Sequence, residues 1–151
     1  MSEDYFFAKP IGMWVVVEEI TGVVKTVHFI ENYKGKTRIT HPVSLDLLRY
    51  FNGETVDFST YDVDLSGFTP FQQHVLTAAR HIRWGNCITY SQLAGLIERP
   101  LATRAVGTAL GKNRVPVIIP CHRVVSKKGT GGFSYGVEMK TQLLDLESIK
   151  V

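Results

Sequence analysis

The sequence predicts an α+β fold in which a small β-rich domain precedes a helical one. Residues 4–30 are rich in β-branched and aromatic side chains, a composition typical of strands. Beyond residue 68, two capping boxes and apolar residues at helical spacing indicate a series of short helices. The intervening residues 59–68 carry Ser, Thr, Asp and Gly, as a linker does, so we expect domains over 1–68 and 69–151.

The first domain is expected to contain a hairpin, a helix and a return strand. Strands over 14–17 and 23–30 would be joined by a turn at 21–22, where a glycine supplies the positive φ angle. A helix over 42–52 should follow, because a proline suits its first turn, its apolar residues recur at helical spacing and a glycine follows its end. Residues 54–58 are expected to return as a short strand.

The second domain is expected to contain four helices. A capping box at Thr69 opens the first, which residues 84–85 end, and a second box at Thr89 opens the next. The third is expected over 101–110 and the last after residues 133–136, beyond a Gly-rich turn or wing. Five residues of the third helix are expected to face inward: Leu101, Ala105, Val106, Ala109 and Leu110.

The second and third of these helices suggest a helix-turn-helix, because a tight turn over 98–100 joins them within a basic region. The outward residues of the third helix would include Ala102, Thr103 and Arg104. Small side chains there would let the helix backbone approach another surface closely. An ordinary pair of antiparallel helices is the alternative that the pattern leaves open.

The charge of the chain is divided unevenly. Residues 1–68 hold 6 Lys or Arg against 10 Asp or Glu, a net charge of −4, whereas residues 69–151 hold 11 against 4, a net charge of +7. A basic half beside an acidic half favours a polyanion such as nucleic acid as the partner of the basic half. The alternative is that these surface lysines and arginines only keep the domain soluble.

A potential nucleophile follows the apolar run at 117–119. This run predicts a strand that ends at Pro120, since proline cannot donate a ladder hydrogen bond. Cys121 then enters a loop beside His122 and Arg123, whose positive charges would lower the pKa of the thiol and make it reactive. The alternative is an inert core cysteine, because a free cysteine behaves as a small apolar residue.

Other classes of protein do not fit the sequence. There is no apolar stretch of about 18 residues, so no membrane span is expected. The acidic amino terminus does not resemble a secretory signal, and we expect a cytoplasmic protein in which Cys87 and Cys121 are free thiols. The histidines and cysteines lack the spacing of zinc ligands, so no metal is expected.

The segment Pro-Cys-His-Arg-Val at 120–124 resembles the active-site signature of the O6-alkylguanine-DNA alkyltransferases. The resemblance extends over about 69–147, and its other matches follow in the same order along the chain: Tyr90, Arg104-Ala105-Val106-Gly107, Asn113, Ser134 and Glu147. It implies an RNase H-like β/α domain followed by a winged helix-turn-helix domain.

The resemblance also implies a function, namely the direct reversal of DNA alkylation. The alkyl group of O6-alkylguanine would pass irreversibly to Cys121, so each molecule would act once, and O4-alkylthymine is a second candidate substrate. The implied partner is double-stranded DNA, bound by a monomer through the minor groove with no cofactor. Alkyltransferase-like proteins bind such lesions but lack the cysteine, which this chain has, and nothing marks the remote histidine that a cysteine hydrolase needs.

The family's functional residues carry over to specific positions. Cys121 would accept the alkyl group, His122 would take its proton through an ordered water, Glu147 would orient His122, and Asn113 would brace the loop. The residues implied to contact the base are Tyr90, which would donate to guanine N3, Ser134, whose N–H would face O6, and Val124, whose carbonyl would accept from the exocyclic amine.

The DNA contacts implied by the resemblance lie on the recognition helix. Arg104 would occupy the place that the flipped nucleotide leaves in the stack. The small residues implied to dock in the minor groove are Ala102, Thr103, Ala105 and Gly107. Two positions depart from familiar members, since Arg114 replaces a proline and Tyr135 replaces a smaller residue. We expect Tyr135 to lie near the pocket and to affect which alkyl groups fit.

Overall fold

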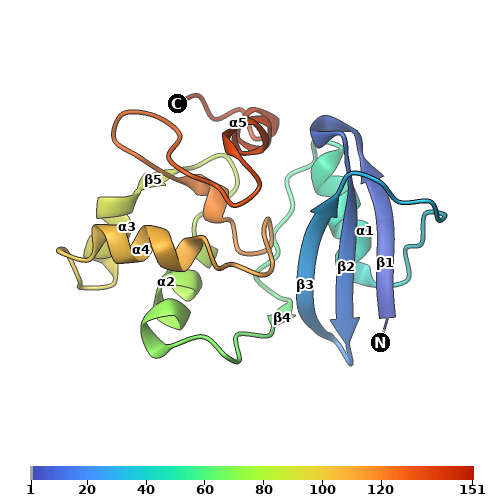
Figure 1. Ribbon diagram of the computed structural model, residues 1–151, viewed down its shortest axis with the longest axis horizontal. Helices are drawn as coiled ribbons and strands as arrows, with labels where there is room; N and C mark the ends of the chain where they lie inside the picture. Colours follow the sequence, from blue (N-terminus) through green and yellow to red (C-terminus); the bar gives the residue numbers. More distant parts are fainter. Residues whose placement is uncertain (1) are drawn as a thin grey trace.

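A computed structural model describes residues 2–151, so Met1 of the predicted first domain lies outside the described residues. The fold is α+β, as predicted (Figure 1). The elements in chain order are β1 (Ser2–Ala8), the 3-10 helix η1 (Lys9–Ile11), β2 (Met13–Ile20), β3 (Val23–Ile30), α1 (Pro42–Phe51), β4 (Asp62–Val63), α2 (Pro70–Arg80), β5 (Ile88–Thr89), α3 (Tyr90–Leu96), α4 (Thr103–Leu110), the 3-10 helix η2 (Cys121–Arg123), β6 (Val124–Val125) and α5 (Val137–Leu146).

The first half is a four-stranded sheet with α1 packed on one face (Figure 1). Strands β1, β2 and β3 pair antiparallel in sequence order, and β4 adds to β3 in parallel. The predicted hairpin is confirmed, with Thr21 and Gly22 both at positive φ. The predicted helix is confirmed to within one residue, and it buries Leu47 and Tyr50 completely.

The predicted strand over 54–58 is wrong, because that segment forms no strand. The return strand is instead β4, two residues long, inside the segment that we assigned to the linker. Phe58 is buried, and its carbonyl accepts a hydrogen bond from Arg80 Nη2 at 2.9 Å rather than from a strand. The apolar residues of this segment therefore reflect burial against the core and not sheet pairing.

Both capping boxes are confirmed. The Gln72 N–H donates to Thr69 Oγ1 at 3.1 Å and the Thr69 N–H to Gln72 Oε1 at 3.0 Å, which satisfies two free donors at the start of α2. Thr89 and Gln92 repeat this arrangement at the start of α3. Helix α2 ends at Arg80, earlier than the expected residues 84–85.

Helix α4 begins two residues later than predicted, which changes the face that it buries. The chain over 99–102 forms a turn, closed by the Ala102 N–H donating to the Arg99 carbonyl at 2.9 Å. Leu101 is therefore 99% exposed and Ala105 is exposed, so the expectation that both face inward is wrong. The other three residues, Val106, Ala109 and Leu110, are buried as predicted.

The strand expected over 117–119 is also wrong. The run is a buried turn, in which Val117 has a φ of 74° and the Ile119 N–H donates to the Val115 carbonyl at 3.0 Å. Prolines at 116 and 120 bracket the run, and neither has an N–H for a ladder. The apolar residues are there because the turn lies in the core, and the turn delivers the chain to Cys121.

The two halves share a core. Buried apolar residues from the sheet, from α1 and from the later helices form one cluster. Direct contacts join the two halves. The Val27 N–H donates to the Arg114 carbonyl at 2.9 Å, and the ring centroids of Phe29 and Tyr135 lie 4.8 Å apart. The division into domains at residue 68 stays a prediction. No helix among residues 2–151 is long and apolar enough to cross a membrane.

Candidate active site

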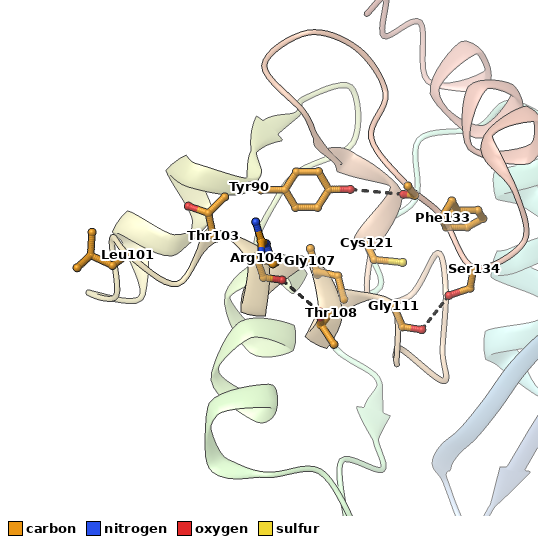
Figure 2. Close-up of a pocket in the computed structure, with 12 residues that line it drawn as sticks. Tyr90, Leu101, Thr103, Arg104, Gly107, Thr108, Gly111, Cys121, Phe133 and Ser134 are labelled. Carbon is orange, nitrogen blue, oxygen red and sulfur yellow. Dashed lines mark hydrogen bonds between the residues drawn. The ribbon is translucent and has the colours of Figure 1, made fainter.

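Cys121 opens η2 and its sulfur faces a pocket of about 960 Å³. The walls come from the start of α3, from α4, and from the loop that precedes α5 (Figure 2). The residues that line it are Tyr90, Leu101, Thr103, Arg104, Gly107, Thr108, Leu110, Gly111, Cys121, Gly132, Phe133 and Ser134. The thiol therefore lies in an accessible cavity and not in a closed core.

Asn113 holds the loop that carries the thiol. Its Nδ2 donates to Cys121 Sγ at 3.2 Å and to the Ile119 carbonyl at 2.8 Å. Its Oδ1 accepts from the Val115 N–H at 3.0 Å. One side chain thus fixes both ends of the buried turn over 115–119 and contacts the sulfur.

His122, the residue that follows Cys121, meets Glu147 away from solvent. His122 Nε2 lies 2.6 Å from Glu147 Oε2, and both side chains are buried. With Nε2–H donated to the carboxylate, the lone pair of the neutral ring is on Nδ1, which is buried and makes no hydrogen bond with the described residues. Burial lowers the pKa of His122 although Glu147 opposes it, so the ring can act as a base.

Glu147 is held as a carboxylate by several donors. Arg123 donates from Nε to Oε1 at 2.8 Å and from Nη2 to Oε2 at 3.1 Å, and the Gly85 N–H donates to Oε1 at 3.1 Å. Burial alone would raise the pKa of Glu147, but His122 and Arg123 outweigh it and lower that pKa to about 2. The side chain of Tyr50 from α1 completes this cluster.

The expectation that the charges of His122 and Arg123 would lower the pKa of Cys121 is wrong. The guanidinium of Arg123 is committed to Glu147 and to the Ile82 carbonyl, and burial raises the pKa of the thiol. The hydrogen bond from Asn113 and the charge of Lys140 act in the opposite direction without overcoming it. A thiol of this kind is protonated at neutral pH, so it needs a base to become a nucleophile.

Lys140 is a site residue that the sequence did not reveal. It is buried in α5, and its Nζ donates to the carbonyls of Val124 at 2.6 Å and Gly132 at 3.0 Å and to Tyr90 Oη at 3.3 Å. Desolvation lowers its pKa to about 8. A lysine between the apolar positions of a helix was the available signal, and such residues usually lie on the solvent face.

The residues expected to contact the base are placed differently around the pocket. Tyr90 and Ser134 line it, whereas Val124 is buried, is not among the lining residues, and its carbonyl accepts from Lys140 Nζ and retains a second lone pair. Tyr135 is not among the lining residues, and its ring packs against Phe29 of the sheet. Its neighbour Phe133, which was not anticipated, is the aromatic residue of this loop that lines the cavity.

The residues expected to contact DNA surround the mouth of the pocket. Thr103, Arg104 and Gly107 line the pocket itself, and Arg104 is exposed (Figure 2). Ala102 and Ala105 lie along an adjacent groove on the same face of α4. An exposed helix face made of small residues and one arginine thus borders the opening above the thiol.

Comparisons with known proteins agree with this arrangement. The model of the "6-O-methylguanine DNA methyltransferase, DNA binding domain" family matches residues 70–149. A methylated-DNA–protein-cysteine methyltransferase of Sulfurisphaera tokodaii is 49% identical over 107 residues, which are 71% of this chain and 65% of that protein. A protein of the same name from Haemophilus influenzae is 36% identical, with 95% of this chain and 85% of that protein covered.

Solved structures extend the similarity to both halves. The crystal structure of Mycobacterium tuberculosis OGT in complex with DNA has a TM-score of 0.80 at 34% identity, covering 95% of this chain and 90% of that one. The O6-methylguanine-DNA methyltransferase of Pyrococcus kodakaraensis has a TM-score of 0.75 at 25% identity, covering 97% and 98%. The chain belongs to the methylated-DNA–protein-cysteine methyltransferase family.

Proposed function

We propose that the chain repairs DNA by direct reversal, moving the alkyl group of O6-alkylguanine to its own Cys121. The observation that carries this proposal is the position of that thiol. Cys121 lines an open pocket, and the next residue, His122, is buried and paired with Glu147, which is the sequence order of a nucleophile, a base and an orienting carboxylate. The protonated thiol and the neutral imidazole are the states that such a transfer requires at its start.

The chemistry balances without a cofactor. His122 takes the thiol proton at Nδ1 through a water, the sulfur forms a bond to the alkyl carbon, and the bond from that carbon to O6 breaks with its electron pair left on guanine. Glu147 stabilises the imidazolium, the guanine anion takes up one proton at N1 from water, and the imidazolium returns its proton to water. The products are guanine and a thioether on Cys121, and because no step removes that thioether, each chain acts once.

The pocket walls would stabilise the leaving base. Tyr90 Oη would donate to guanine N3 as negative charge spreads from O6 into the ring, and the Ser134 N–H would face O6. Lys140 lies 3.3 Å from Tyr90 Oη and can support that donation. The carbonyls of Cys121 and Val124 would accept from the exocyclic amine, with O4-alkylthymine as a second candidate base.

DNA would bind across the exposed face of α4. A stacked base presents no access to O6, so the nucleotide must be flipped into the pocket at a cost of a few kcal/mol. Arg104, which is exposed and lines the pocket, is suited to occupy the vacated place, and small residues on α4 permit docking in the minor groove. In this proposal α3 and α4 form the helix-turn-helix, and the loop over 127–132 forms the wing. The sheet with α1 forms an RNase H-like domain. The protein acts as a monomer in the cytoplasm.

A stoichiometric repair assay tests this function. Methylated duplex is mixed in excess with the full chain, and the restored guanine is counted over time. We expect repair to stop at one guanine per chain, because Cys121 is consumed. Continued turnover would indicate a hydrolase, and binding without any repair would indicate a lesion-binding protein, and either result would overturn the proposal.

A further inference from the structure

Tyr50 brings a hydroxyl group from the first half of the chain to the buried side of the active site. It lies on α1, 97 residues from Glu147, and its side chain is fully buried. Its hydroxyl donates to Glu147 Oε2 at 2.5 Å and lies 3.4 Å from His122 Nε2. The family match begins at residue 70, so the match does not include Tyr50.

The two oxygens of Glu147 are held by different groups. Oε1 accepts from Arg123 Nε and from the Gly85 N–H. Oε2 faces His122, and it accepts from Tyr50 at a shorter distance than from Arg123 Nη2, which lies at 3.1 Å. Of the two other donors to Oε2, Tyr50 is therefore the nearer, and it lies next to the imidazole.

We propose that Tyr50 is a positioning residue for the alkyl transfer, whose hydroxyl holds Oε2 of Glu147 where that oxygen orients His122. The proposal rests on the proposed function. It makes the first half of the chain part of the machinery that activates Cys121, because α1 supplies the hydroxyl. Burial and the neighbouring Glu147 raise the pKa of Tyr50, so the hydroxyl keeps its proton and stays a donor.

The ring of Tyr50 has a separate, structural role. It packs edge-on against Phe51 at 5.2 Å, Phe58 at 6.3 Å and His122 at 6.5 Å between centroids. Replacing Tyr50 by Phe keeps this packing and removes the hydroxyl alone. The substitution therefore separates the positioning role from the contribution of the ring to the core.

The charges around His122 determine how its pKa responds to this change. Burial lowers that pKa, Glu147 raises it, and Arg123 and Lys140 lower it. The hydroxyl of Tyr50 points its positive end at Glu147 Oε2 and so weakens the pull of the carboxylate on a proton at His122. Without the hydroxyl, the pKa of His122 should rise. As the pH falls, the ring should therefore become protonated, and cease to act as a base, at a higher pH than in the unmodified chain.

Single-turnover kinetics with saturating methylated duplex test the proposal across about pH 5 to 8, where histidine titrates. For Tyr50→Phe we expect an unchanged endpoint of methyl groups per chain, because the endpoint counts folded molecules. The rate constant should fall about ten-fold, as removal of an outer hydrogen-bond partner typically does. The acid limb of the pH–rate profile should shift to higher pH by about half a unit.

Tyr61→Phe is the matched control. Like Tyr50, Tyr61 donates its hydroxyl to a carboxylate, in this case that of Asp46 on α1. Among the described residues, Tyr61 makes no hydrogen bond to His122 or Glu147. Its rate constant and pH profile should match those of the unmodified chain. The positioning role is excluded if Tyr50→Phe leaves the rate constant and the acid limb of the pH profile unchanged. It is also excluded if the endpoint of this variant falls in proportion to its rate constant, or if Tyr61→Phe shifts the acid limb by the same amount. An unmodified chain that transfers no methyl group overturns the proposed function as well.

Discussion

The two sides of the active site differ in how firmly they are built. At the two residues that follow Cys121, buried groups meet at short distances, such as 2.6 Å between His122 and Glu147 and 2.8 Å between Arg123 and Glu147. In front of the sulfur, the pocket is open to solvent, and Tyr90 Oη makes a long contact of 3.4 Å with the Gly132 carbonyl, although Ser134 Oγ donates to the Gly111 carbonyl at 2.8 Å. The buried side fixes the proton acceptor, whereas the open side leaves room for a base and its alkyl group.

This difference separates two kinds of substitution. Changes on the buried side should alter stability and chemistry together, because the groups there compensate a buried charge, that of Glu147. Changes on the open side should alter the transfer reaction and leave the fold almost intact.

Replacing Cys121 by Ser should reduce transfer about a thousand-fold or more, since a hydroxyl is a far weaker nucleophile than a thiol that His122 can deprotonate. Affinity for DNA should stay nearly unchanged, because in the proposed function phosphate contacts and α4 would supply it. Transfer rates and binding isotherms of the two proteins measure this. A parallel loss of binding would show that Cys121 has a structural role.

Acid should unfold the chain partly through Glu147. The pKa of Glu147 is about 2 in the folded protein and near 4.5 in the unfolded chain. Its contribution to stability is therefore present above pH 4.5 and is lost as the pH falls toward 2. That contribution is about 3 kcal/mol. Denaturant unfolding at pH 7 and pH 3 should show this loss, and Glu147→Gln should lose stability at pH 7 and show a smaller dependence on pH. An equal dependence in both proteins would contradict the assignment.

Gly131 and Gly132 form a matched pair on the open side. A Cβ at Gly131, where φ is +75°, would lie 2.6 Å from Tyr90 Oη, whereas one at Gly132 would meet nothing within 4 Å. We expect Gly131→Ala to displace Tyr90 and slow transfer by up to about a hundred-fold, because a displaced donor no longer meets guanine. Gly132→Ala should transfer at nearly the normal rate. Similar rates in the two variants would remove Tyr90 from the reaction.

Arg104→Ala should have the smallest effect of these changes, and its size should depend on the substrate. The proposed role of Arg104 is to stabilise a flipped nucleotide, so transfer from duplex should slow about ten-fold, whereas transfer from the free modified base should not slow. Rates on both substrates measure the difference. Equal slowing on both would assign Arg104 to the chemistry of the pocket instead.

The elements that could be predicted from the sequence are those that local hydrogen bonds determine. Thr69 and Thr89 form the expected capping boxes because each needs only the residue three positions on. The runs at 54–58 and 117–119 were misread as strands because both are apolar, and apolar residues report burial without reporting a pairing partner. The face of α4 was misread because the turn before it is two residues longer than expected.

The site follows the same rule. The contiguous Cys-His-Arg segment could be singled out, and Asn113 and Glu147 lie within hydrogen-bonding distance of Cys121 and His122, while the roles that the resemblance implies for them stay predictions. Arg123 was given the wrong partner, because spacing along the chain does not show which way a side chain points. Lys140 and Tyr50 were missed because their contacts lie 16 and 97 residues away in the sequence, and their patterns are those of ordinary helix residues.

Locating the transferred methyl group tests the account most directly, and the chain supplies an internal control. Cys87 is a second free thiol of intermediate exposure, but it packs against a small cluster near α5 and does not line the pocket. After reaction with methylated duplex, peptide mass spectrometry should find one added methyl group on the peptide containing Cys121 and none on that containing Cys87. Methyl on Cys87, or repaired DNA with neither cysteine modified, would contradict the assignment of Cys121 as the acceptor.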